Sequence, residues 1–176
     1  MFQALNPFFI VLFAPVFAYF WVYLNKKNIE PNATIKFAIA ILFISIGFFS
    51  LVVGSGLAGD DFRVSLVFLV VMYLFHTFGE LCLSPVGLSM VTKLSIARIA
   101  GLMMGIWFLS SSLAGYVSGL IAGLMSIPTD IEDMQNKSAA SLKIYSSNFE
   151  TLGILALVVS FFLFLISLIV SKYMKD

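Results

Sequence analysis

The sequence predicts an all-α membrane protein with five transmembrane helices. Of its 176 residues, 61% are hydrophobic and 11% are charged, and the mean hydropathy is +1.06. Soluble domains are typically about 45–50% apolar and about 25% charged. Five apolar runs approach or exceed the roughly 20 residues that a helix needs to cross the hydrocarbon core of a bilayer. They cover about residues 5–24, 35–54, 64–92, 100–125 and 150–171, and we expect residues 1–176 to form one bundle in the lipid bilayer.

The distribution of basic residues predicts the orientation of these spans. Seven of the ten Lys and Arg residues fall on one side, namely Lys26, Lys27, Lys36, Lys93, Arg98, Lys172 and Lys175. The other side holds three basic residues and six acids. Because cytoplasmic loops carry the excess of Lys and Arg, the first side is expected to be cytoplasmic. The protein is then a multi-pass membrane protein with its N-terminus outside and its C-terminus in the cytoplasm.

Composition argues against several functional classes. The net charge is +1 and the basic residues are scattered, so nothing indicates a nucleic-acid partner. Cys82 is the one cysteine, and no Cys or His companion stands at metal-ligand spacing from it. Composition therefore gives no sign of a nucleic-acid partner or of a metal site built on Cys82.

The first run carries two prolines, Pro7 and Pro15, which interrupt backbone hydrogen bonds within a span. Aromatic residues gather at its cytoplasmic end, as they do in an interfacial belt: Tyr19, Trp21 and Tyr23. Asn6 is one of few amides near membrane depth. From the pattern alone it is either an interfacial cap for this helix or part of a functional site.

The second and fifth runs carry little besides apolar and hydroxyl side chains. The run at 35–54 is apolar all round and is expected to be a lipid-facing brace, and the run at 150–171 is expected to be scaffold. The segment at about 126–149 is polar enough to lie in water and could form a short surface helix.

The third run contains the strongest functional signal, an acid near the middle of a span. An ionised carboxylate at that depth costs roughly 2.5–3.5 kcal/mol on insertion scales, so it normally faces a cavity or a partner. Glu80 is that acid. His76 lies one helical turn before it and Ser84 one turn after it, so the three side chains share one face, and Pro85 directly follows Ser84. Burial favours the protonated carboxyl group and a nearby cation favours the ionised one, so a cationic solute could compete with a proton at Glu80.

Two other interpretations of this column remain open. A metal site that uses His76 and Glu80 would need at least one more ligand, and Cys82 points to a different face. Alternatively, Glu80 is structural and pairs with a helix outside this chain, because buried ion pairs need not be functional.

The fourth run carries small residues four apart, namely Gly101, Gly105, Gly115, Gly119 and Gly123. Such a stripe lets another helix approach closely, and tight packing is its expected role. Trp107 and Phe108 lie far from either end of the run. They are therefore expected to pack internally or to line a pocket.

The stretch GELCLSPVGLSMVTKLSIARIAGLMMGIWFLSSSLAGYVSG, from Gly79 to Gly119, resembles the proton-dependent oligopeptide transporters, a branch of the major facilitator superfamily. The opening FQALNPFFIVLFAPVFAYFW resembles their eighth transmembrane helix. The resemblance implies that the five helices are helices 8 to 12 of a twelve-helix core, that is, a partial carboxy-terminal bundle. An eighth helix that starts outside and a twelfth that ends inside agree with the charge pattern.

The resemblance also implies roles for individual residues. Glu80 would contact the amino group of a di- or tripeptide and take part in proton coupling, with Ser84 lining the same pocket. Asn6 would contact the amino-terminal end of the peptide, and Trp107 with Phe108 would shape its side-chain pocket. His76 has no family-wide role and is a further candidate for proton coupling.

The resemblance implies that much of a transporter lies outside this chain. Its amino-terminal bundle would hold the peptide carboxylate and carry the ExxERF-type proton-coupling motif, and its seventh helix would carry a gating acid. We therefore expect a fragment of a proton-coupled di/tripeptide symporter of a bacterial-type inner membrane, which contributes the half-site for the peptide amino group and is unlikely to transport alone. The resemblance also implies protons as the coupling ion, no cofactor, no metal and no enzymatic activity. The alternatives are a non-transporting membrane scaffold or assembly subunit, or a family member that moves a different solute.

Overall fold

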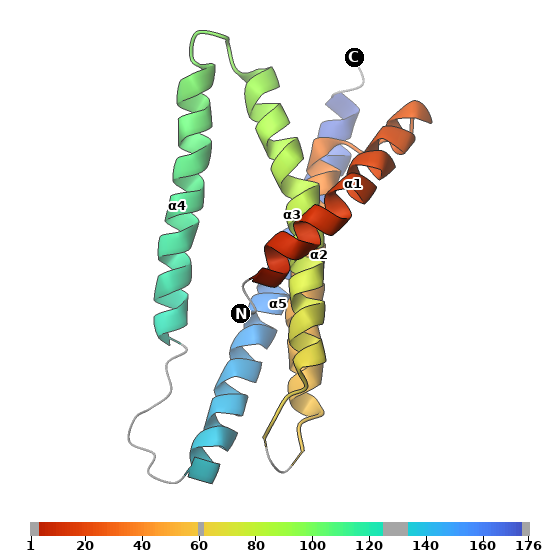
Figure 1. Ribbon diagram of the computed structural model, residues 1–176. Coiled ribbons are helices and arrows are strands. Elements are labelled where there is room, and N and C mark those ends of the chain that lie inside the picture. Colours follow the sequence, from red (N-terminus) through yellow and green to blue (C-terminus); the bar gives the residue numbers. More distant parts are fainter. Residues whose placement is uncertain (1–3, 60–61, 125–133, 174–176) are drawn as a thin grey trace.

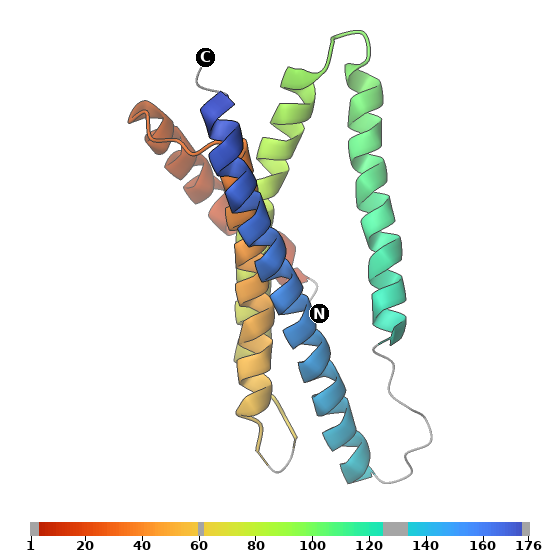
Figure 2. The same ribbon diagram turned by 180° about the vertical axis from the view of Figure 1, so that it is seen from behind.

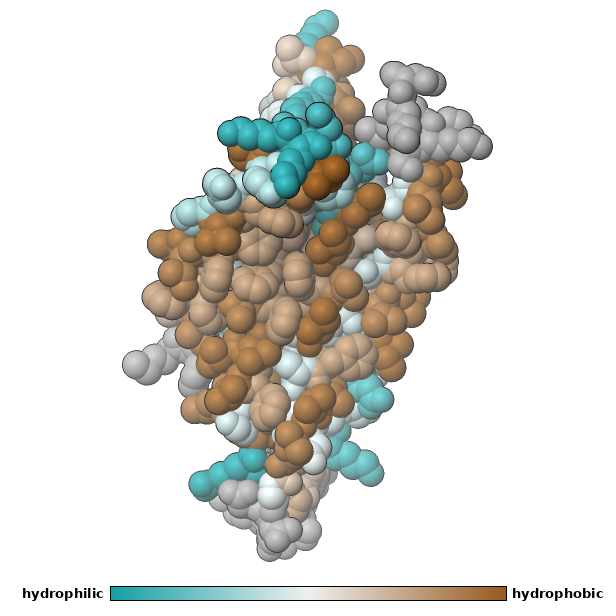
Figure 3. All heavy atoms as spheres, turned by 90° about the vertical axis from the view of Figure 1, so that its right-hand side faces the viewer, coloured by the Kyte–Doolittle hydropathy of each residue, from teal (hydrophilic) through white to brown (hydrophobic). Residues whose placement is uncertain are grey.

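The computed structural model describes residues 4–59, 62–124 and 134–173, and this part of the chain forms five helices (Figure 1). They are α1 (Leu5–Lys26), α2 (Ala33–Gly56), α3 (Leu66–Leu94), α4 (Ala100–Leu124) and α5 (Met134–Tyr173). All five are long and apolar enough to cross a membrane. A broad apolar belt lies between hydrophilic ends on the face seen in Figure 3. The predicted fold class is confirmed.

The last helix is longer than the sequence suggests. α5 begins at Met134, so residues 134–149 continue directly into the final span instead of forming a separate surface helix. This stretch contains neither Gly nor Pro, the two residues that most disfavour a helix, and nothing in it ends the helix. The rest of the polar segment, residues 126–133, lies outside the described residues.

Helix α2 lies between α3 and α5, so its expected role as a lipid-facing brace is wrong. Against α3, a Cβ atom on Gly79 would come within 2.7 Å of the Ala40 carbonyl oxygen, so the two backbones approach closely at this glycine. On the other side, buried Ser45 donates a hydrogen bond of 2.8 Å to the Gly153 carbonyl of α5. The small and hydroxyl side chains of α2 and its neighbours therefore make it the centre of the bundle.

The backbones of α1 and α4 approach this body only at α3 among the described elements, and a side-chain contact between Trp21 and Lys36 adds a link from α1 to α2. α1 crosses α3 near its middle (Figure 1). α4 follows the C-terminal end of α3 and stands apart from the other helices in both views (Figures 1 and 2). A Cβ atom on any of the five α4 glycines named above would have nothing within 4 Å. The tight packing expected of this stripe is therefore not made by any described part of the chain.

Candidate functional site

The candidate site lies where the first turn of α1 meets the middle of α3. Asn6 Nδ2 donates a hydrogen bond of 3.1 Å to Glu80 Oε2. Asn6 is half-buried, whereas the Glu80 side chain lies on an exposed face of the chain. Two residues that the sequence marked separately, 74 positions apart, therefore form one polar pair. The exposed carboxylate can accept a further hydrogen bond or face a cation.

Thr77 completes this pair and was missed in the sequence analysis. Its hydroxyl donates a hydrogen bond of 2.6 Å to Asn6 Oδ1, and its Oγ1 also lies 2.8 Å from the Tyr73 carbonyl oxygen. Thr77 is fully buried. Residues three apart on a helix are neighbours on its surface, so the spacing from Thr77 to Glu80 was a usable signal.

The alternative role for Asn6, a cap on the first helix, is wrong. α1 has Ala4 at its cap position and no side-chain hydrogen bond there. Both ends of the Asn6 amide are used on α3 instead. Asn6 thus ties the start of α1 to the centre of α3.

His76 lies against α2, away from the Asn6–Glu80 pair. Its ring meets Phe48 edge to face, with centroids 4.8 Å apart, and a Cβ atom on Gly47 would come within 2.5 Å of its Cδ2. His76 Nε2 is buried without a hydrogen-bond partner among the described residues. His76 and Glu80 share a helical face by spacing, but His76 contacts α2 and Glu80 contacts α1.

The remaining predicted site residues lie nearer the α3–α4 connection. Ser84 follows Glu80 by one turn and is half-buried. Trp107 packs against Gly87, two turns and about 10 Å along α3 from Glu80. Its neighbour Phe108 is 58% exposed. The structure thus brings Asn6 and Glu80 into contact, while Trp107 and Phe108 lie on a separate helix.

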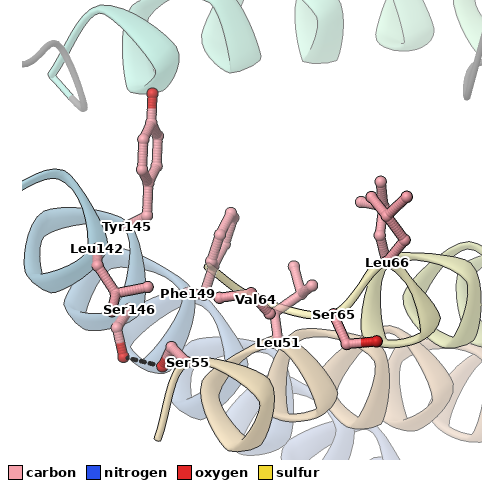
Figure 4. Close-up of a pocket in the computed structure, with 10 residues that line it drawn as sticks. Leu51, Ser55, Val64, Ser65, Leu66, Leu142, Tyr145, Ser146 and Phe149 are labelled. Carbon is pink, nitrogen blue, oxygen red and sulfur yellow. Dashed lines mark hydrogen bonds between the residues drawn. The ribbon is translucent and has the colours of Figure 1, made fainter. Parts of the chain in front are cut away.

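The hollow at the start of α3 differs in chemistry from this pair. A cavity of about 380 Å³ lies between the end of α2, the start of α3 and the first half of α5, where Tyr145, Phe149 and Leu66 project to the same side (Figure 4). Its polar contact is a 2.7 Å hydrogen bond between Ser55 and Ser146. No charged side chain lines it. In the described residues, no three of His, Cys, Asp and Glu lie together as metal ligands would.

A second ionic cluster lies between the ends of α1 and α2. Buried Lys36 forms an ion pair with Glu30, and its Nζ lies 4.4 Å from the centre of the Trp21 ring. Hydrogen bonds from Lys36 and Asn25 hold the pKa of the Glu30 carboxyl below its usual range. Because Lys36 and Glu30 already neutralise each other, this cluster is a structural tie.

Known proteins resemble the chain over most of its length. Dipeptide and tripeptide permease A of Proteus mirabilis is 37% identical over 171 residues, which is 97% of this chain and 34% of the permease. Peptide transporter YePEPT of Yersinia enterocolitica is 45% identical over 128 residues, which is 69% of this chain and 24% of that transporter. The chain thus spans about a third or less of each relative's length.

Solved structures agree. A crystal structure of peptide transporter POT in complex with sulfate has a TM-score of 0.79 and 35% identity, and the match covers 99% of this chain and 32% of that one. A mutant of peptide transporter POT in complex with alafosfalin matches with a TM-score of 0.70 and 33% identity. The model of the POT family matches residues 1–140. This chain belongs to the POT family.

Proposed function

We propose that this chain supplies the carboxy-terminal helices of a proton-coupled di/tripeptide symporter of the inner membrane. The contact between Asn6 and Glu80 carries the proposal, because it places a carboxylate and an amide together on an exposed face at membrane depth. The family membership and the names of the relatives support a peptide as the solute. The charge pattern supports an N-terminus outside and a C-terminus in the cytoplasm.

In this mechanism Glu80 alternates between two partners. The ionised carboxylate accepts hydrogen bonds from the ammonium group of a peptide, with Asn6 beside it at the amino-terminal end. A protonated Glu80 costs less to keep within the membrane, and the arriving ammonium group displaces its proton. Competition for one carboxylate would by itself exchange peptide for proton, so symport requires the displaced proton to pass to an acceptor in the helices outside this chain and to cross in the same direction as the peptide. Ser84 lines the peptide-binding pocket that Glu80 and Asn6 help to form. Trp107 and Phe108 shape the part of this pocket that receives a peptide side chain.

The chain would act together with the helices that precede it in its relatives. Two of its surfaces are open for them: the glycine stripe of α4, and the apolar cavity beside Tyr145 and Phe149. Alternating access moves one bundle against another around a midplane site, so both bundles are required. We call this combination the assembled transporter.

The test is uptake of a radiolabelled dipeptide by the assembled transporter in proteoliposomes, with an acidic exterior and an inside-negative potential. Glu80→Gln keeps the shape of the side chain and removes the titratable proton, so concentrative uptake should be lost at unchanged protein yield. The matched control is Glu150→Gln, which makes the same change at an exposed acidic residue of α5. His76→Phe in the same assay measures whether the second candidate contributes. Unchanged concentrative uptake by Glu80→Gln would contradict the proposal, and uptake of a solute other than peptides by the unaltered protein would redirect it.

A further inference from the structure

The buried hydroxyl of Thr77 stands behind the Asn6–Glu80 pair and has two acceptors within reach. These are Asn6 Oδ1 at 2.6 Å and the Tyr73 carbonyl oxygen at 2.8 Å. A threonine hydroxyl has one proton to donate. Thr77 is 0% exposed, so water does not supply its partners. The side chain of Asn6 therefore meets a donor that is fixed within α3.

The direction of these hydrogen bonds follows from the chemistry of the three groups. An ionised carboxylate only accepts hydrogen bonds, so Asn6 must turn its NH₂ group toward Glu80. This leaves Asn6 Oδ1 on the other side, where Thr77 donates to it. If the amide turned over, its carbonyl oxygen would face the carboxylate oxygen, and two acceptors would oppose each other. Thr77 holds the amide in the orientation that serves an ionised Glu80.

No other charged group competes for this position on the helices packed against α3. The Lys, Arg, His, Asp and Glu residues of α1 and α2 are Lys26 and Lys36, both within a turn of a helix end, and α4 has none. On α3 itself, His76 packs against α2, and Lys93 lies in the last turn of the helix, about 20 Å along it from Glu80. The orientation of the Glu80 carboxylate therefore depends on Asn6 within this chain.

We propose that Thr77 is a positioning residue for the peptide amino group. It orients the Asn6 amide, the amide holds Glu80 Oε2, and the second carboxylate oxygen, Oε1, is left to receive the ammonium group. This inference rests on the proposed function, and it adds to it a residue that does not touch the peptide. Thr77→Ser retains the hydroxyl, whereas Thr77→Val retains the shape of the side chain and loses the donor.

In the assembled transporter, Thr77→Val should raise the KM for a dipeptide about three- to tenfold, as expected for the loss of one hydrogen bond. The maximal rate should change little, because Glu80 is intact. The KM of Thr77→Ser should stay close to that of the unaltered protein. In an Asn6→Ala background, Thr77→Val should have no further effect, because Thr77 acts through Asn6. Thr151→Val is the matched control, since its hydroxyl bonds only to the Ser147 carbonyl of its own helix. An equal rise in KM with and without Asn6 would overturn the inference.

A second measurement does not need transport. The chain itself, labelled with ¹⁵N-asparagine in lipid nanodiscs, gives a side-chain NH₂ signal for Asn6 that Asn6→Ala identifies. We expect this signal to move in Thr77→Val and to stay in place in Thr77→Ser. Identical Asn6 signals in the unaltered protein and Thr77→Val would overturn the positioning role, whatever the solute. Absence of uptake by the unaltered assembled transporter, with the Asn6 signal moved as expected, would instead count against the proposed function alone.

Discussion

The indole ring of Trp107 on α4 lies directly over Gly87 on α3. A Cβ atom at position 87 would come within 2.2 Å of Trp107 Cη2 and 2.6 Å of Cζ2, and such contacts do not occur between real atoms. Gly87 is buried, and α4 contacts the described bundle through α3 only. This pair therefore joins α4 to the rest of the chain.

Gly87→Ala should separate the two helices at this contact. The added methyl group must displace the indole ring, and forced packing of this kind typically costs about 1–3 kcal/mol. The chain has two tryptophans, so unfolding in detergent, followed by fluorescence in a Trp21→Phe background, reports on Trp107 alone. We expect a lower midpoint of unfolding and a more solvent-exposed indole.

Two controls separate this clash from a general effect of alanine. Gly105→Ala adds the same methyl group to α4 where nothing lies within 4 Å, so it should be neutral or slightly stabilising. Trp107→Ala removes the ring, and Gly87→Ala should then cost little. Because this background lacks the reporting indole, its unfolding is followed by circular dichroism. A full loss of stability in that double variant would show that the contact is not the cause.

The ion pair between Glu30 and Lys36 should make stability depend on pH in the acidic range. The pKa of Glu30 is lowered in the folded protein, first by the hydrogen bond from Lys36 and then by that from Asn25. A carboxyl group with a lowered pKa stabilises the fold above its unfolded pKa, here about 4.5, and this contribution is lost as pH falls through the folded value. The unaltered chain should therefore be more stable than Glu30→Gln near neutral pH, and the difference should disappear at low pH.

This prediction is tested by unfolding both chains in detergent at a series of pH values from neutral to about 3. Glu150→Gln is the control for acids that lie outside the cluster, and its curve should stay parallel to that of the unaltered chain. A constant difference between Glu30→Gln and the unaltered chain across the whole range would contradict the assignment, because the ion pair would then contribute nothing that a neutral amide does not.

Most of the fold could be predicted because transmembrane length is set by the bilayer. The five apolar runs match the five helices to within a few residues, except where α5 extends through residues 134–149. That stretch was misjudged because polarity indicates exposure to water, whereas helix continuation depends on the absence of Gly and Pro. The central place of α2 was also missed, since hydropathy does not reveal which face of an apolar helix meets protein and which meets lipid.

The candidate site could be predicted in its parts but not in its connections. Glu80 was identified by the cost of a charge at membrane depth, and Asn6 by the family resemblance. Their hydrogen bond depends on how α1 crosses α3, which no local pattern encodes. His76 shares a helical face with Glu80 by spacing, but its ring packs directly against Gly47 on α2. Thr77 was overlooked because a threonine in a helix commonly bonds to its own backbone, and its oxygen does lie 2.8 Å from the Tyr73 carbonyl oxygen here.

The chain by itself should bind to membranes but not accumulate peptides. It spans about a third of the length of its relatives, and no helix of the described structure packs against the glycine stripe of α4. Because rocking around a midplane site requires two bundles, vesicles that contain only this chain should take up no more labelled dipeptide under a proton gradient than protein-free vesicles. Vesicles with the assembled transporter provide the positive control. Gradient-driven accumulation by the chain alone would show that these five helices form a complete pathway, for instance between copies of the chain. It would refute the proposal that Glu80 belongs to a peptide site that requires both bundles.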